Sequence, residues 1–246
     1  MSVKPAAFRF FPGKTVKDKH TLNSDSAVEN KSAAPPKGRL RENVEAIVIA
    51  VLLALFIRAF VVQAFKIPSG SMKETLQIGD HILVNKFIYG IKLPLVGTPV
   101  IPISQPERED IVVFRYPEDP DKDFIKRTVA IAGDTVAIRN KQVYLNGTPL
   151  DEDYVVHKDP RVLPKAFQPR DNMDPVTVPP GKIFVMGDNR DHSYDSRFWG
   201  FVDLRDVKGE AFIIYWSWDK EHFPGGGEWL SFWRWVRWDR IGTIIH

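Results

Sequence analysis

Apolar residues dominate a stretch of 22 positions, residues 44–65 (VEAIVIAVLLALFIRAFVVQAF). Built as a helix, this stretch would be about 33 Å long, which is enough to cross a hydrocarbon core of about 30 Å. Arg58 interrupts it in its last third, where a long side chain can reach the membrane interface. The pattern therefore predicts a single transmembrane helix over residues 44–65.

Two other interpretations of this stretch are open. It could be a buried core helix, although the positive charge before it fits a membrane span better. It could also be a cleaved signal peptide, because Val62-Gln63-Ala64 places small residues at the spacing that such cleavage requires. The 43 residues before it are much longer than a usual signal-peptide n-region, so we favour an uncleaved anchor.

After residue 65 the pattern changes to short runs rich in Val, Ile, Phe and Tyr, which are typical of strands. These runs are HILVNKFIYG (81–90), DIVVFRYP (110–117), FIKRTVAIAG (124–133) and KIFVMG (182–187). Turn signals separate them, and Asn146-Gly147 predicts a hairpin. Because no helical repeat lies between the runs, we expect an all-β domain over residues 66–246, built of antiparallel sheets or a distorted β-barrel. Residues 151–178 are rich in proline and charge and are expected to be a long surface excursion.

Charge is spread unevenly along the chain. Residues 1–43 carry nine Lys and Arg against four Asp and Glu, whereas residues 59–246 carry 24 basic and 26 acidic residues. The positive-inside bias predicts that residues 1–43 lie in the cytoplasm and that the domain beyond the span is extracytoplasmic, with the span in the plasma (inner) membrane. The tail is rich in Lys, Ser, Ala and Pro and lacks periodicity, so we expect it to be disordered. The chain has no cysteine, which excludes disulfides, thiolate metal sites and a cysteine nucleophile.

Three separated segments contain the candidate chemistry: FKIPSGSM (65–72), DFIKR (123–127) and GDNRDHSYDSR (187–197). Taken alone, each has an ordinary interpretation as a loop or as the edge of a strand. The acidic residues and the histidine of the third segment could in principle bind a metal, but their spacing fits neither an EF-hand nor a zincin. We therefore expect neither a metal nor another cofactor.

Taken together, the three segments resemble bacterial type I signal peptidases in their order, their local sequence and their position after an apolar span. The resemblance covers nearly all of residues 60–136 and 179–217, together with the closing RIGTIIH. Residues 137–178 match weakly and are shorter than the corresponding part of the best-known members, which implies a smaller inserted β subdomain there. Glu74 departs from the pattern, because many members have proline at this position.

The resemblance implies a serine protease in which Ser71 is the nucleophile and Lys126 the general base. A lysine has a reference pKa of about 10.4, but burial can depress it by up to about 3–5 units. Phe124 would contribute to this burial, because alternation along a strand places it on the same face as Lys126. Ser69 would help to stabilise the oxyanion, together with the backbone N–H of Ser71. Ser193 would orient the lysine amine.

The resemblance further implies cleavage of exported preproteins, after a small residue that has another small residue two positions before it. Four apolar residues that flank the catalytic groups would line shallow pockets, although each could equally be ordinary core: Ile67, Met72, Leu76 and Ile125. Asp195 and Arg197 are expected to hold the third segment through ion pairing and hydrogen bonds.

The expected partners are preproteins with signal peptides and the phospholipid membrane. Four tryptophans lie within residues 228–238, and Trp beside Arg suits a membrane interface as well as ordinary core packing. Nucleic-acid binding is not expected, because the large domain is slightly acidic and lacks a basic stripe.

Two rival functions are also open. A self-cleaving repressor with the same dyad would need a DNA-binding helix-turn-helix where this chain has an apolar span. A non-catalytic, membrane-anchored β-rich adaptor would give Ser71 and Lys126 no special role.

Overall fold

The computed structural model describes residues 39–92, 99–101, 103–219 and 233–246. Most of the basic tail and the first part of the tryptophan-rich stretch lie outside these residues, so the predictions for them stay predictions. The described chain starts with helix α1 (Arg39–Phe56), which continues as a π-helical turn, η1 (Ile57–Val61).

The helical part differs from the expected span of residues 44–65 at both ends. It starts at Arg39 and ends at Val61, and strand β1 (Val62–Lys66) follows at once. This strand forms because its backbone pairs with β2 (Asp80–Asn85), with Val62 opposite Asn85 and Lys66 opposite His81. Among the described residues, no helix has both the length and the apolar character that crossing a membrane requires.

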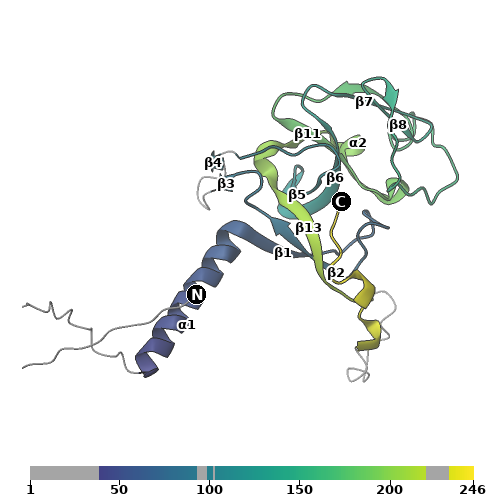
Figure 1. The fold of residues 1–246 in the computed structure, drawn as a ribbon. Coiled ribbons are helices and arrows are strands. Elements are labelled where there is room, and N and C mark those ends of the chain that lie inside the picture. Colours follow the sequence, from purple (N-terminus) through teal and green to yellow (C-terminus); the bar gives the residue numbers. More distant parts are fainter. Residues whose placement is uncertain (1–38, 93–98, 102, 220–232) are drawn as a thin grey trace, which may run out of the picture. The chain divides into compact units, whose positions relative to one another are not determined.

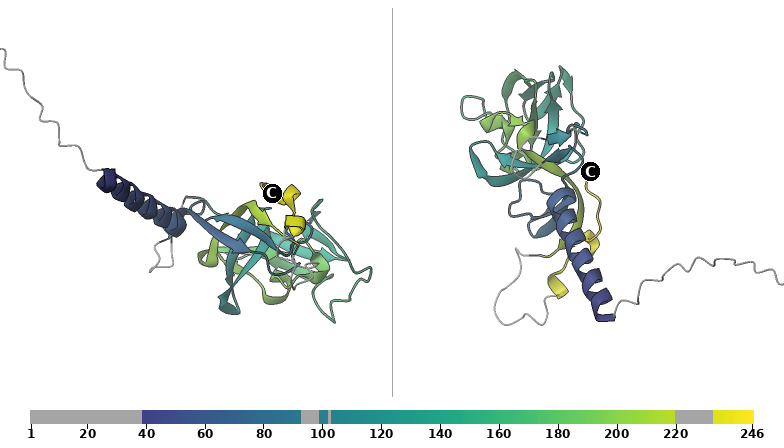
Figure 2. Two further views of the ribbon diagram at one scale, coloured as in Figure 1. Left: turned by 90° about the horizontal axis from the view of Figure 1, so that it is seen from below. Right: turned by 90° about the vertical axis from the view of Figure 1, so that its left-hand side faces the viewer.

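The larger sheet has seven strands in the order β1-β2-β13-β5-β6-β11-β12 (Figure 1). Besides β1 and β2 its strands are β5 (Ile111–Tyr116), β6 (Asp119–Ile131), β11 (Lys182–Met186), β12 (Val202–Asp203) and β13 (Val207–Ser217). Every neighbouring pair is antiparallel, which confirms the expected antiparallel β architecture. Figure 2 shows these long, twisted strands from two further sides.

A second sheet of four strands follows the order β10-β7-β8-β9. Its strands are β7 (Thr135–Arg139), β8 (Gln142–Leu145), β9 (Thr148–Pro149) and β10 (Met173–Thr177). The predicted hairpin at Asn146-Gly147 joins β8 to β9, and its two residues have φ of 52° and 85°, as a tight hairpin turn requires. Apolar side chains of this sheet share one buried cluster with β6 and β11, so the two sheets pack against a common core.

The remaining elements are short. β3 (Ile91–Lys92) pairs with β4 (Pro99–Ile101), and single helical turns occur at η2 (Arg190–His192), α2 (Ser196–Trp199), η3 (Leu204–Asp206) and η5 (Trp238–Arg240). Residues 150–172 contain no strand and no helix. We call these residues the strandless segment.

Candidate active site

Ser71 lies in a tight loop between β1 and β2. The two ends of the loop are tied together, because Ile67 N donates to the carbonyl of Asp80 at 2.8 Å and Gly79 N donates to the carbonyl of Ile67 at 3.1 Å. Inside the loop, Met72 and its neighbours form a turn whose apolar side chains enter the core. Ser71 is therefore held at the start of this turn, where it is buried.

Lys126 comes from the middle of β6, where β5 and β11 fix the strand from both sides. Its side chain is 4% exposed, and its Nζ donates hydrogen bonds to Oγ of Ser71 at 2.8 Å and to the carbonyl of Ile125 at 3.0 Å. The amine also lies 5.3 Å from the centre of the Phe124 ring. Burial lowers the pKa of Lys126 to about 8, although the negative charges of Asp195 and Asp188 act in the opposite direction.

This geometry can support nucleophilic catalysis. A lysine with a pKa near 8 is neutral in a substantial fraction of molecules at slightly alkaline pH, and a neutral amine can accept a proton. The serine hydroxyl is within hydrogen-bond distance of that amine, which is the relation that a nucleophile and its base require.

Gly187 and Asn189 hold the loop of Ser71 from the other side. Asn189 N donates to the carbonyl of Ser71 at 3.1 Å, and Nδ2 of Asn189 donates to the carbonyl of Gly70 at 3.0 Å. A Cβ at Gly187 would lie 2.4 Å from the carbonyl oxygen of Ser71, so only glycine allows this close approach. The third polar segment of the sequence therefore packs directly against the nucleophile loop.

A buried ion pair between Arg127 and Asp188 lies beside the dyad. Nε and Nη2 of Arg127 donate to the two carboxylate oxygens of Asp188 at 2.9 and 2.8 Å, and both side chains are almost fully buried. Asp188 also accepts a hydrogen bond of 2.6 Å from the hydroxyl of Thr75, four residues after Ser71. This pair thus links β6 to the nucleophile loop.

Asp195 and Arg197 form a second buried ion pair, with 2.8 Å between Oδ1 and Nε. Burial alone would raise the pKa of Asp195, but the positive charge and hydrogen bonds of Arg197, together with hydrogen bonds from Ser193 and the backbone of Gly187, outweigh it and keep that pKa below its usual value. Arg197 also donates to the carbonyl groups of Arg190 and Arg170, and Asp195 accepts from Gly187 N. Within the described residues, no three His, Cys, Asp or Glu side chains gather as a metal-binding group.

The two other serines are near Ser71 but make no bond to the dyad. Ser193 is buried against Gly187, and the hydrogen bonds of Lys126 go to Ser71 and Ile125 rather than to its hydroxyl. The expected hydrogen bond from Ser193 to Lys126 is therefore not formed in this conformation. Ser69 is exposed in the loop before Ser71. The roles of both serines stay predictions.

The four expected pocket residues all belong to one buried apolar cluster. Ile67, Met72, Leu76 and Ile125 are between 0% and 9% exposed, so in this conformation they are core side chains around the dyad. Their role as a substrate pocket stays a prediction. Glu74, the departure from the family pattern, is exposed and pairs with Lys158 at 3.1 Å.

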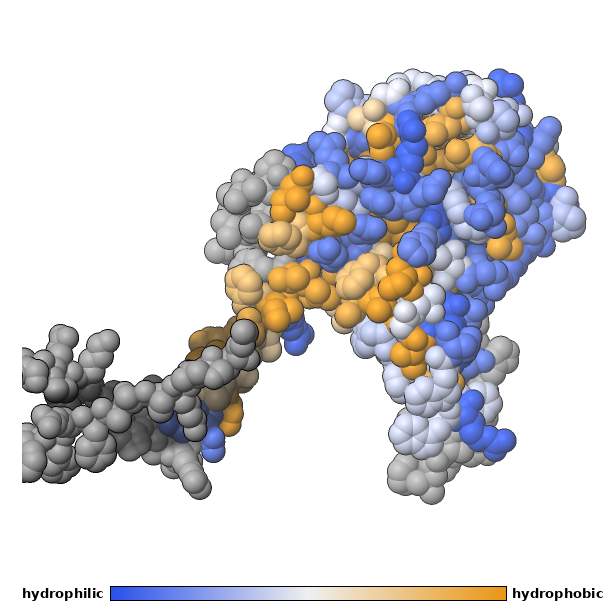
Figure 3. All heavy atoms as spheres, viewed as in Figure 1, coloured by the Kyte–Doolittle hydropathy of each residue, from blue (hydrophilic) through white to orange (hydrophobic). Residues whose placement is uncertain are grey.

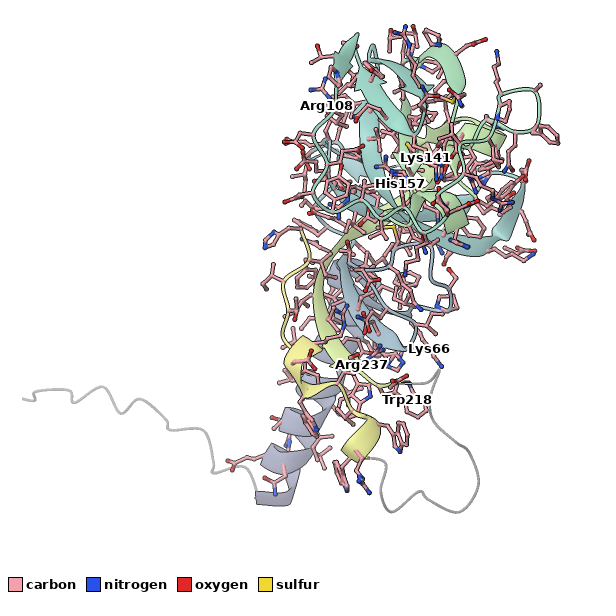
Figure 4. All side chains as sticks on the ribbon, turned by 90° about the vertical axis from the view of Figure 1, so that its right-hand side faces the viewer. Lys66, Arg108, Lys141, His157, Trp218 and Arg237 are labelled. Atoms are coloured by element: carbon pink, nitrogen blue, oxygen red, sulfur yellow. The ribbon has the colours of Figure 1, made fainter. Side chains whose placement is uncertain are left out.

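The described part of the tryptophan-rich stretch has a mixed environment. Trp233 and Trp238 are more than half exposed, whereas Trp235 is half-buried. Arg237 in the same stretch donates to the carbonyl of Trp218 at 2.9 Å, and both residues appear in the lower part of Figure 4.

Sequence reasoning missed the contacts that fix the loop. It gave no catalytic or positioning role to Thr75, Asp188 or Asn189. The one available signal was the strand alternation that places Arg127 on the face opposite Lys126, but the partner of Arg127 is 61 positions away in the sequence.

Comparisons with known proteins show the family of this chain. The family model described as signal peptidase, peptidase S26, matches residues 40–216. Signal peptidase I of Pseudomonas aeruginosa is 40% identical over 198 residues, covering 68% of this chain and 69% of the relative. The probable signal peptidase I-1 of Synechocystis sp. is 36% identical over 224 residues, covering 88% of this chain and 94% of the relative.

A solved signal peptidase I from Enterococcus faecalis is 34% identical in sequence, covers 44% of this chain and 97% of that chain, and has a TM-score of 0.36. The match of the family model and the identity to the curated relatives confirm the resemblance seen in the three segments. The chain therefore belongs to the bacterial type I signal peptidases of the S26 family, which are serine endopeptidases.

Proposed function

We propose that this signal peptidase cuts preproteins with Ser71 as the nucleophile and Lys126 as the general base. The neutral amine of Lys126 takes the hydroxyl proton while Oγ of Ser71 bonds to the scissile carbonyl carbon. The ammonium then gives that proton to the departing amine as the peptide C–N bond breaks, which leaves an acyl-enzyme ester. The same amine next deprotonates a water molecule, which hydrolyses the ester and regenerates Ser71.

The observation that carries this proposal is the 2.8 Å contact between the two side chains in a buried setting. Burial is what makes a lysine suitable, because it lowers the pKa of Lys126 to about 8. We further propose that Ser69 and the backbone N–H of Ser71 stabilise the oxyanion, and that Ser193 orients the amine once substrate is bound. The exposed position of Ser69 and the buried position of Ser193 beside Gly187 are compatible with these roles.

We propose that the substrates are exported preproteins and that the cut follows a small residue. The support is the function of the relatives, which are signal peptidases. The apolar residue Met72 directly follows Ser71 and the apolar residue Ile125 directly precedes Lys126 in the sequence, and both belong to one buried cluster with Ile67 and Leu76, which is compatible with a preference for small substrate side chains.

We propose that α1 and η1 attach the enzyme to the membrane, with the basic N-terminal part in the cytoplasm and residues 66–246 outside. The apolar side chains of α1 are exposed, for example Ile49 at 65% and Leu52 at 60%. Figure 3 shows further apolar side chains at the surface over β1, the strand that leads to the nucleophile loop. Flotation of the full chain with phospholipid vesicles tests this attachment, and a chain that stays with the free-protein fraction would contradict it.

The test of the activity uses the full chain in phospholipid vesicles and a preprotein whose signal peptide ends in Ala-x-Ala. We expect a single cut after the second alanine, located by mass spectrometry of the new N-terminus. Ser71→Ala, prepared in the same way, should leave the preprotein intact. The same cut by Ser71→Ala, or no cut by the unaltered chain, would overturn the proposal.

A further inference from the structure

Residues 152–156 of the strandless segment contact residues 188–190, which in turn hold the loop of Ser71. Val156 N donates to the carbonyl of Asp188 at 2.9 Å, and Arg190 N donates to the carbonyl of Val156 at 3.1 Å. Further along, Lys141 and His157, close together in Figure 4, both reach the carboxylate of Asp191, at 2.7 and 3.5 Å. Residues 152–156 therefore run alongside the loop that holds Ser71.

Tyr154 covers the buried Arg127 within this contact. The centre of its ring lies 3.9 Å from the guanidinium carbon of Arg127, the distance of a close cation–π contact. The orientation of the ring is fixed at its other end, because the hydroxyl of Tyr154 donates to Glu152 at 3.0 Å. Glu152 in turn forms a buried ion pair with Arg190, with bonds of 2.9 and 2.5 Å.

A continuous series of contacts leads from Tyr154 to the nucleophile. Arg127 binds both carboxylate oxygens of Asp188, and Asp188 accepts a hydrogen bond from the hydroxyl of Thr75 in the loop of Ser71. The next residue, Asn189, donates from its backbone to the carbonyl of Ser71. A buried ion pair offsets its desolvation cost only when its geometry is good, its surroundings are of low dielectric and its remaining polar groups are satisfied. The ring of Tyr154 is the group that covers the guanidinium at this point.

We propose that Tyr154 is a positioning residue of the active site. It keeps water from the Arg127–Asp188 pair, and this pair fixes the loop of Ser71 relative to Lys126. The inference rests on the proposed role of the Ser71–Lys126 dyad. Because a misplacement of about 1 Å can cost about 100-fold in rate, loosening the pair is expected to slow the chemical step rather than to weaken substrate binding.

The test measures kcat and KM of the full chain in phospholipid vesicles with a model preprotein. Tyr154→Leu removes the ring, whereas Tyr154→Phe keeps the ring and removes only the hydroxyl. The matched control is Tyr144→Leu, because Tyr144 is also half-buried under an arginine, with Arg139 at 5.3 Å, but lies on β8 of the small sheet. Circular dichroism of each variant verifies that it is folded.

We expect Tyr154→Leu to lower kcat by about 10- to 100-fold with KM within about twofold of the unaltered chain. Tyr154→Phe should restore kcat to within about threefold, since the ring rather than the hydroxyl covers Arg127. Tyr144→Leu should change neither constant. Should Tyr154→Leu fail to fold, Tyr154→Met replaces it with the same expectation.

Three results would overturn the inference: an unchanged kcat in Tyr154→Leu, a rise in KM at constant kcat, or an equal loss of kcat in Tyr154→Phe. Failure of the proposed dyad looks different, because Ser71→Ala would then still cleave the preprotein. If the unaltered chain cuts and Ser71→Ala does not, the dyad stands whatever the Tyr154 variants do.

Discussion

The seven-stranded sheet and the strandless segment are held in place by different forces. Buried apolar clusters and antiparallel strand pairing stabilise the sheet, for example through Phe114 and Val84, which are fully buried. The strandless segment instead relies on side-chain ion pairs, such as that of Arg170 with Asp171 and that of Arg190 with Glu152. The seven-stranded sheet is thus the apolar part of the domain and defines its fold, whereas the strandless segment is a polar part whose geometry depends on individual hydrogen bonds and ion pairs.

The two halves of the proposed dyad reflect this difference. Lys126 projects from β6, where it pairs with Val112 of β5 and the next residue, Arg127, pairs with Met186 of β11. Ser71 lies in a loop that two polar contacts hold. The carboxylate of Asp188 accepts a hydrogen bond from the hydroxyl of Thr75, and the backbone N–H of Asn189 donates to the carbonyl of Ser71. One half of the dyad is therefore as rigid as the sheet, and the other depends on the polar contacts around it.

The largest expected effect comes from removing either half of the dyad. Ser71→Ala and Lys126→Met should each lower the rate of preprotein cleavage by about 10⁴-fold or more, because nucleophile and base act as a unit. Lys122→Met is a matched control on the same strand, since the side chain of Lys122 is 67% exposed. Rate assays and circular dichroism check the prediction. Cleavage by folded Lys126→Met at a rate close to that of the unaltered chain would refute the role of the lysine.

A second prediction compares the buried pair with the apolar core. Arg127→Met leaves Asp188 buried without its partner, so the free energy of unfolding should fall by about 3–5 kcal/mol and kcat should fall too. Phe184→Ala should cost a similar amount, about 3–5 kcal/mol, but leave kcat of the folded enzyme unchanged. Urea unfolding gives the free energies, and assays without urea give kcat. An unchanged kcat in Arg127→Met would show that the pair serves stability alone.

A smaller contrast lies within the strandless segment, where two arginines contact Asp159. Arg170 is 8% exposed and also binds the buried Asp171, so Arg170→Ala should lower the free energy of unfolding by about 3 kcal/mol. Arg161 is 77% exposed, and Arg161→Ala should leave the free energy of unfolding unchanged within error. Equal losses in the two variants would show that burial does not decide the strength of these pairs.

The difference between apolar and polar parts also explains what the sequence could predict. The runs that became β2, β5, β6 and β11 were visible because strand-forming apolar residues cluster between turn signals. Strand β1 was hidden, because its residues continue the apolar run of α1 and only pairing with β2 separates them.

For the site, the motifs indicated Ser71 and Lys126, but not the polar groups that hold them. Arg127 and Asp188 are 61 positions apart, and Thr75 is 113 positions from Asp188. No local periodicity links residues at such distances, and charged residues in a strand or a loop are usually solvated. Tyr154 was hidden for the same reason, since it lies in a stretch whose composition indicates only a surface excursion.

The sign of the pH dependence follows from the charge that Lys126 must lose. A general base acts only when it is deprotonated, and burial lowers the pKa of Lys126 to about 8. The active fraction of the enzyme is therefore small below this pH and approaches its maximum above it.

The pH dependence of kcat/KM for preprotein cleavage by the full chain tests the dyad most directly. We predict a tenfold fall for each pH unit below about 8 and a plateau above it. A kcat/KM that is constant between about pH 6 and 9 would contradict Lys126 as the general base.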